Sequence, residues 1–80
     1  MIVIYGKDNC AHCITAQKLC KSKNIDYTYK KLGEDYDMDE FDKISRETNQ
    51  RTFPFIFRET TVNKEFIGGA QELNMLLRQN

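Results

Sequence analysis

Two cysteines separated by two residues, Cys10 and Cys13, stand between a short apolar segment and a helical pattern. Residues 2–5 are strand formers ended by Gly6, which is typical of a central strand buried on both faces. From residue 11, apolar side chains recur at about one turn's spacing; they are Ile14, Ala16, Leu19 and Cys20. The lysines of this segment lie mostly on the other side of the expected helix; they are Lys18, Lys21 and Lys23. The pattern predicts a strand, a turn over residues 7–10 and a helix that ends near Asn24.

The rest of the chain alternates between strand and helix patterns. Residues 25–32 show the apolar–polar alternation of a second strand. We expect a helix from about residue 37 to about 48, with a buried stripe of Met38, Phe41 and Ile44. Residues 55–58 and 62–67 predict a hairpin of two strands, because they are rich in strand formers, Val62 among them. Gly68-Gly69 breaks that pattern before a last helix over residues 70–78, whose apolar residues are Leu73, Met75, Leu76 and Leu77.

The predicted element order is β-α-β-α-β-β-α. Its first three elements form a βαβ unit, which requires a right-handed crossover between parallel strands. The later hairpin adds an antiparallel pair. We therefore expect an α/β fold with a four-stranded mixed sheet flanked by three helices on both faces, in a single domain over residues 1–80.

Composition excludes several classes of protein. The 12 basic and 12 acidic residues cancel, unlike the strongly basic balance of a nucleic-acid binder. No apolar run approaches the roughly 20 residues that span a bilayer, and the start lacks the pattern of a secretory signal. We expect a cytoplasmic protein that binds neither nucleic acid nor membranes. In that reducing compartment a close cysteine pair is more often catalytic or metal-binding than structural.

The position of Cys10 favours redox chemistry. The first helix begins directly after it, and the unpaired N–H groups and positive dipole end of a helix stabilise an anion. This lowers the pKa of a thiol and raises its thiolate fraction at neutral pH. Cys13 lies about one turn later on the same side, so it can reach Cys10 and should be the more buried of the two. A Cys-x-x-Cys pair near a βαβ unit indicates a thioredoxin-like redox motif.

The other chemistry-bearing residues have competing interpretations. A structural zinc site needs four ligands, and only His12 and Cys20 remain to complete one, so we expect no metal. Cys20 is interpreted as a small buried hydrophobe, with a regulatory or glutathionylated thiol as the alternative. His12 either stabilises the Cys10 thiolate when protonated or is a tolerated surface residue. Residues 33–42 hold half of the acids, which we interpret as a helix start rather than an acidic binding site.

Four motifs together resemble the glutaredoxin family, and they span nearly the whole chain. They are Lys7-x-x-Cys10-x-x-Cys13, then Gln50-Arg51-Thr52-Phe53-Pro54, then Gly68-Gly69, and finally Glu72-Leu73. The resemblance implies a thioredoxin-like fold in which Pro54 is in the cis form and faces the cysteines.

The resemblance also implies a glutathione groove. Its expected residues are Lys7, His12, Arg51, Thr52, Phe53, Pro54, Gly69, Ala70 and Gln71. Lys7 would pair with a glutathione carboxylate or help to hold the Cys10 thiolate, and the Phe53 backbone would bond the cysteinyl part in extended form. Arg51 would bind the glycine carboxylate. The N–H groups of Ala70 and Gln71 would receive the γ-glutamyl carboxylate, because a helix N-terminus is a ready anion site.

The chain also departs from the family's common pattern. Ala11 and His12 replace the usual Pro and Tyr between the cysteines, and Phe53 replaces a valine. Gln71 stands where Asp or Ser is common, and the hairpin after Pro54 is longer than usual. A histidine before the second cysteine resembles strongly oxidising disulfide carriers.

The function that the resemblance implies is glutathione-dependent thiol–disulfide exchange. We expect a monomer, because the predicted core faces use all of the apolar residues. Cys10 would attack disulfides of proteins or glutathione mixed disulfides, and Cys13 would resolve the intermediate. Ribonucleotide reductase is a candidate protein partner. The first alternative is a redoxin that takes electrons from thioredoxin reductase and donates them to ribonucleotide reductase; Lys7, Arg51 and the two glycines favour glutathione instead. The second is an iron–sulfur binding module, in which two subunits share a cluster.

Overall fold

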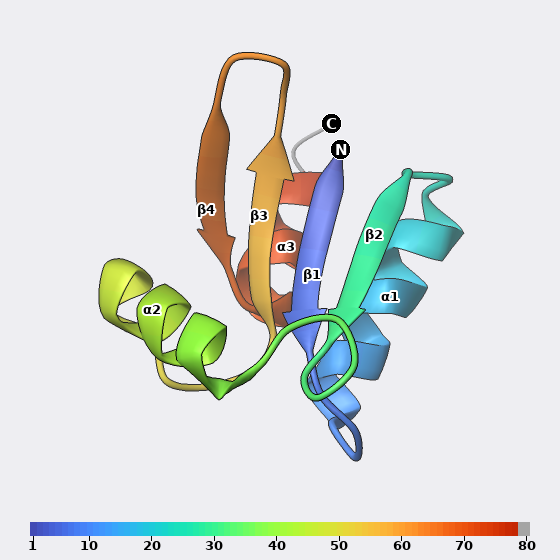
Figure 1. The fold of residues 1–80 in the computed structure, drawn as a ribbon. Coiled ribbons are helices and arrows are strands. Elements are labelled where there is room, and N and C mark those ends of the chain that lie inside the picture. The colour runs from blue at the N-terminus through green and yellow to red at the C-terminus, as the bar shows by residue number, and fades with distance from the viewer. Residues whose placement is uncertain (79–80) are drawn as a thin grey trace.

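The computed structural model describes residues 1–78 and contains seven elements in the predicted order. They are β1 (Ile2–Gly6), α1 (Ala11–Ser22), β2 (Tyr27–Lys31), α2 (Met38–Thr48), β3 (Phe55–Glu59), β4 (Lys64–Gly68) and α3 (Ala70–Arg78). The strands form one four-stranded sheet in the order β2-β1-β3-β4 (Figure 1). β1 pairs with β2 in parallel and with β3 antiparallel, and β4 completes an antiparallel hairpin with β3. The predicted mixed sheet is confirmed.

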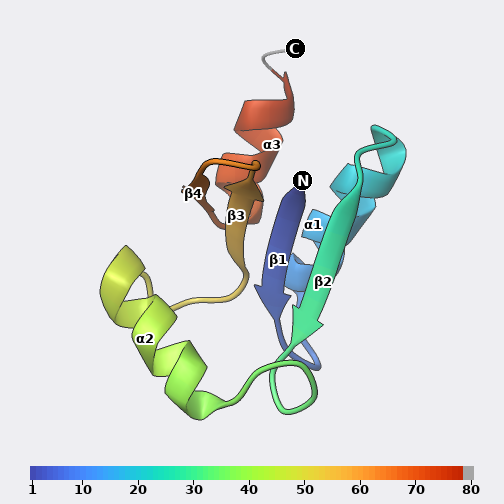
Figure 2. The same cartoon turned by 45° about the horizontal axis from the view of Figure 1, so that its top comes forward.

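The sheet separates two apolar clusters. Because successive strand residues point to opposite faces, Ile2 and Ile4 of β1 join the cluster beneath α1 and α3, together with Leu73. Val3 and Tyr5 join the cluster on the other face, where α2 contributes Ile44. Figure 2 shows α3 and α2 on opposite sides of the sheet. All five residues of β1 are buried, as expected for a central strand covered on both faces.

Residues 33–42 start a helix only in part. Asp37 is the N-cap of α2, and its Oδ1 accepts a hydrogen bond of 3.0 Å from the N–H of Glu40. This satisfies one of the N–H groups that a helix start leaves unpaired. Glu34 and Asp35 precede the helix and contact Lys31 instead. The interpretation of this segment as a helix start therefore holds for Asp37 and the residues after it.

Several apolar residues that the patterns place in the core lie at the surface. Ile14, Met38 and Met75 are exposed by 51%, 56% and 56%, so their assignment to buried helix faces was wrong. Val62 is 91% exposed and lies in the turn between β3 and β4, because the last strand begins only at Lys64. The expectation of a monomer assumed that core faces consume all apolar residues, and these four residues contradict that assumption.

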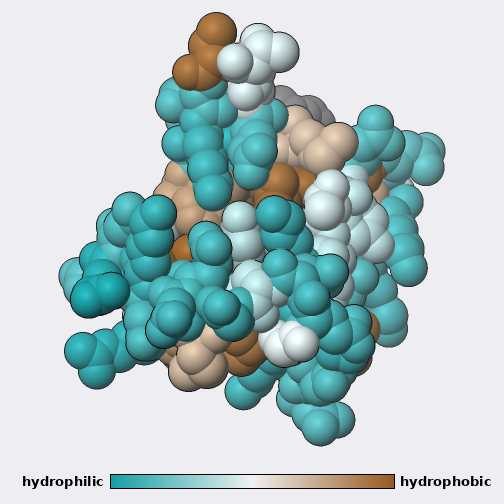
Figure 3. All heavy atoms as spheres, in the orientation of Figure 1, coloured by the Kyte–Doolittle hydropathy of each residue, from teal (hydrophilic) through white to brown (hydrophobic). Residues whose placement is uncertain are grey.

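Hydrophilic side chains dominate the face that carries α2. Figure 3 shows them over most of that view, with apolar residues scattered between them. Among residues 1–78, no helix combines the length and the apolar character that a membrane crossing demands.

Candidate active site

The motif segments meet at one end of the sheet. Tyr5 at the end of β1 pairs with Phe55 at the start of β3, so the residues after Tyr5 and those before Phe55 leave the sheet at the same edge. Gly69 lies there too, because a Cβ built on it would be 3.7 Å from the carbonyl oxygen of Pro54. In Figure 1 this is the lower end of the sheet, where β1 leads into α1. The fold thus brings together three stretches that are far apart in sequence.

Cys10 and Cys13 form a disulfide at the start of α1. Their Cα atoms lie 5.2 Å apart, and Cys10 is the N-cap of the helix. The N–H of Cys13 donates a hydrogen bond of 3.2 Å to Cys10 Sγ, so a helix N–H group points at this sulfur. Cys10 is 9% exposed and Cys13 only 1%, which confirms the predicted order of burial. Cys10 is therefore the sulfur that an incoming thiol or disulfide reaches more readily.

The loop before β3 is held from within by Gln50. The Phe53–Pro54 peptide bond is cis, as the resemblance implies, and Pro54 is fully buried. Gln50 Nε2 donates hydrogen bonds of 2.7 Å to the carbonyl of Thr52 and 2.9 Å to that of Pro54. This role of Gln50 does not follow from its place in the sequence motif, because hydrogen bonds from a side chain to the backbone of its own loop leave no periodic signal.

The side chain of Phe53 packs against other aromatic rings. Its ring stacks on Phe41 of α2 with 5.2 Å between centroids and meets Phe55 edge-on at 5.5 Å. The ammonium of Lys7 lies over the same ring, 5.1 Å from its centroid. A cation at this distance is attracted by the ring's electrons. Two of the predicted site residues, Lys7 and Phe53, are therefore in direct contact.

The remaining predicted residues fall into two groups. His12, Ala70 and Gln71 line an open cavity of about 250 Å³ between α1 and α3. Arg51 lies instead in a groove of about 340 Å³ along α2, with Phe41 and Asp42. Gly69 donates its N–H to Glu72 Oε1 over 2.7 Å, at the start of α3. Thr52 is exposed and contributes its carbonyl to the bond with Gln50. His12 and Arg51 therefore line two different cavities.

Cys20 is separate from this site. It is completely buried in the cluster beneath α1 and α3, as its interpretation as a small hydrophobe requires. Burial raises the pKa of its thiol above the ordinary value, because desolvation disfavours the charged form. Within residues 1–78, no three histidine, cysteine or acidic side chains are arranged to hold a metal ion.

This burial predicts selective labelling. In the reduced, folded protein, iodoacetamide at pH 7 should modify Cys10 and leave Cys20 unmodified until denaturant is added, since only an accessible thiolate reacts. Mass spectrometry of tryptic fragments measures both sites. Fast modification of Cys20 in the folded protein would contradict its placement.

The raised pKa of Cys20 also predicts how stability depends on pH. As the pH rises, the unfolded chain loses the Cys20 proton before the folded protein does, so the free energy of unfolding should fall above about pH 9.

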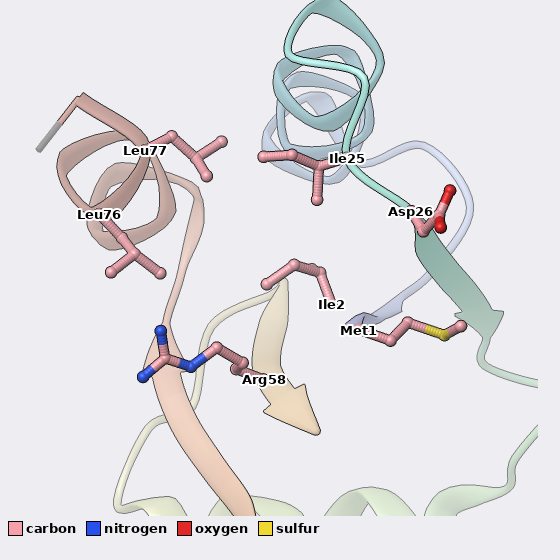
Figure 4. A pocket seen from close by; sticks show the side chains of 7 residues that line it. All are labelled: Met1, Ile2, Ile25, Asp26, Arg58, Leu76 and Leu77. Carbon is pink, nitrogen blue, oxygen red and sulfur yellow. The ribbon is translucent and has the colours of Figure 1, made fainter. Parts of the chain in front are cut away.

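A further cavity, of about 470 Å³, lies at the other end of the sheet. Ile2 at the start of β1 forms its floor, and Ile25 and Leu77 face each other across it (Figure 4). Asp26 and Arg58 stand at its sides. The cysteines follow the opposite end of β1, so this cavity is not part of their site.

Comparison with known families agrees with this geometry. A family model described as Glutaredoxin matches residues 2–67 of the chain. No curated protein sequence matches it significantly. The match covers both cysteines, the loop around Pro54 and all four strands up to the penultimate residue of β4.

Solved structures with the same fold include two plant glutaredoxins. The buckwheat glutaredoxin–glutathione complex is 25% identical, with a TM-score of 0.80 over 98% of this chain and 68% of that one. Wheat glutaredoxin is 24% identical, with a TM-score of 0.81 over 99% and 70%. The glutaredoxin-like NrdH-redoxin of Escherichia coli, which has a thioredoxin-like activity profile, is 17% identical, with a TM-score of 0.63 over 99% and 93%. With a matching family model over most of its length and a disulfide between Cys10 and Cys13, the chain belongs to the glutaredoxin family of thiol–disulfide oxidoreductases.

Proposed function

We propose that the protein is a cytoplasmic, glutathione-dependent reductase of protein disulfides and glutathione mixed disulfides, with Cys10 as nucleophile and Cys13 as resolving thiol. The observation that carries this proposal is the asymmetry of the disulfide. Cys10 Sγ is the more exposed sulfur and receives a helix N–H, whereas Cys13 is almost completely buried. A thiolate at Cys10 is favoured by that N–H and by the helix dipole.

The reaction is a sequence of thiolate exchanges. The Cys10 thiolate attacks one sulfur of a substrate disulfide, the substrate S–S bond breaks, and the other substrate sulfur leaves as a thiolate that takes up a proton. Cys13 loses its proton and attacks Cys10 Sγ, which releases the second substrate thiol and leaves the Cys10–Cys13 disulfide. Two glutathione molecules then reduce that disulfide and leave as oxidised glutathione. Each exchange breaks one S–S bond and forms another, so electrons balance.

One cavity is lined by His12, Ala70 and Gln71, and the other by Arg51; this arrangement suits an extended ligand with a carboxylate at each end. The N–H groups at the start of α3, beside His12 and Gln71, would receive the γ-glutamyl carboxylate. Lys7 and Arg51 would meet the glycine carboxylate on the other side of the loop that carries Thr52 and Phe53. The buckwheat glutaredoxin of the same fold was solved as a complex with glutathione, which supports this assignment. Proteins with exposed disulfides are the proposed substrates, and ribonucleotide reductase is one candidate.

A coupled assay tests the electron source. One arm supplies NADPH, glutathione and glutathione reductase; the other supplies NADPH and thioredoxin reductase, and both follow NADPH oxidation with the same disulfide substrate. We expect turnover with glutathione only. Turnover with thioredoxin reductase only would retain the cysteine chemistry but overturn the glutathione site, in favour of a redoxin. Inactivity in both arms, together with a coloured, dimeric protein, would favour the iron–sulfur module.

A further inference from the structure

The last residue of β1 and the two residues after it are held by one other segment of the chain. The carbonyl of Gly6 accepts hydrogen bonds from the Tyr36 hydroxyl, at 2.8 Å, and from the N–H of Leu32, at 3.0 Å. The carbonyl of Lys7 accepts one from the Tyr29 hydroxyl, at 3.2 Å. Asp8 pairs with the ammonium of Lys31 at 2.9 Å. We call residues 29–36, which supply all four groups, the clamp segment.

The two tyrosines hold the loop from opposite faces of the sheet. Tyr29 packs against the cluster beneath α1 and α3, whereas Tyr36 packs against the cluster that α2 covers. Glycine is required at residue 6, since a Cβ at this position would collide with the ring of Tyr29. Both hydroxyls are hydrogen-bond donors at neutral pH, since an ordinary phenol has a pKa of about 10 and burial raises the pKa of both.

The clamp segment is itself constrained by local contacts. The N–H of Gly33 donates to the carbonyl of Tyr36 at 2.8 Å, and the N–H of Lys31 donates to Asp35 Oδ2 at 2.9 Å. Glu34 pairs at 3.1 Å with the same Lys31 ammonium that pairs with Asp8. Tyr36 also meets the ring of Tyr5 edge-on, with 5.2 Å between centroids. These contacts fix the clamp segment, so it can hold residues 6–8 in one position.

The held loop carries the reactive group. Only Asn9 separates Asp8 from Cys10, and Asn9 has a φ of 55°, in the left-handed region that asparagine tolerates better than most residues. Lys7, whose carbonyl Tyr29 holds, places its ammonium over Phe53. The positions of Lys7 and of Cys10 at the start of α1 therefore depend on where the clamp segment holds residues 6–8.

We propose that Tyr36 and Tyr29 are positioning residues for the reaction of Cys10: their hydroxyls hold the loop that places Lys7 and the Cys10 sulfur. The proposal rests on the proposed role of Cys10 as nucleophile but not on glutathione as electron donor. Neither tyrosine touches the reacting sulfurs. Both act through the backbone of residues 6 and 7, and a small displacement of a reacting group costs a large factor in rate.

The test is the alkylation of reduced protein by iodoacetamide across a range of pH. The Cys10 thiolate displaces iodide and forms a C–S bond, so the rate follows the thiolate fraction and needs no reductase. In Tyr36→Phe, the ring remains and only the hydroxyl is lost. We expect the pH profile to move to higher pH. On its low-pH limb, where the rate is proportional to the thiolate fraction, the rate should fall by about threefold to tenfold, as a shift of half to one pKa unit would give. Tyr29→Phe should shift the profile in the same direction.

Tyr27→Phe is the matched control. Tyr27 lies on the same strand as Tyr29, but its hydroxyl faces Gln17 of α1 at 3.5 Å and does not contact the loop. This variant should keep the wild-type profile, and His12 is unchanged in all three variants. A wild-type profile in Tyr36→Phe and Tyr29→Phe, with circular dichroism showing both folded, would overturn the proposal. If wild-type protein were alkylated mainly at Cys13, the assignment of Cys10 as nucleophile would fail first, and this inference with it.

Discussion

Replacement of Cys10 by serine should reduce disulfide reduction to the rate measured without protein. The hydroxyl of serine does not form a disulfide, so neither the mixed disulfide nor the Cys10–Cys13 bond can arise. Cys13 cannot substitute for Cys10, because it is only 1% exposed and lies beneath the more accessible sulfur. The measurement is NADPH oxidation in the coupled assay with a protein disulfide as substrate.

Cys13→Ser should separate two activities. Without a resolving thiol, the mixed disulfide between Cys10 and a protein substrate persists, so protein disulfide reduction should stop. A mixed disulfide with glutathione can still be resolved by a second glutathione, so deglutathionylation should continue. Mass spectrometry of the trapped intermediate would identify Cys10 as the linked residue.

Cys20→Ser is the control for both variants. Cys20 belongs to the cluster beneath α1 and α3 and not to the site, so its loss should leave both activities near those of the wild type. Equal activity of Cys10→Ser and wild type would refute the proposed mechanism. Loss of both activities in Cys20→Ser, with the protein still folded, would show that the third thiol takes part.

The order and type of the elements could be predicted because local patterns determine them. Residues 2–5 are apolar without interruption and form the buried central strand, and the residue types around Cys10 place it at a helix start. Pairing of β1 with β2 follows from the βαβ unit, and pairing of β3 with β4 follows from the hairpin. The antiparallel pairing of β1 with β3, which joins the two halves of the sheet, does not follow from either local pattern. The convergence of Lys7, Phe53 and Gly69 came from the family resemblance, since no local rule relates residues so far apart.

The errors concern which apolar side chains face the core. Ile14 is adjacent to the buried Cys13, and Met38 occupies the first turn of α2, before the helix reaches the sheet at Ile44. Helical periodicity defines the buried stripe of a helix only to within a neighbouring residue, so a residue at the edge of the stripe is easily assigned to the wrong face.

The hydrogen bonds of Tyr36 and Gln50 were missed for another reason. They are side-chain bonds to backbone carbonyls, and such bonds depend on the final path of the loops.

Leu73→Ala should destabilise the protein by about 3 kcal/mol, since truncating a buried leucine removes apolar contacts and leaves a cavity. Leu73 is completely buried and belongs to the cluster with Ile4 of β1 and Ile56 of β3. A small domain has only about 5–15 kcal/mol of stability in total, so this loss is a large share. Urea denaturation of oxidised wild type and variant, followed by circular dichroism, measures the difference in the free energy of unfolding.

Met75→Ala on the same helix is the matched control. Met75 is 56% exposed, so its replacement should change the free energy of unfolding by no more than about 0.5 kcal/mol. The pair of variants tests the orientation of α3, because the sequence pattern assigns both residues to the apolar face and the structure buries only Leu73. If Met75→Ala cost as much as Leu73→Ala, α3 would have to be rotated relative to the sheet. Such a rotation would also move Ala70 and Gln71 relative to His12, so this measurement of stability constrains the geometry of the proposed glutathione site as well.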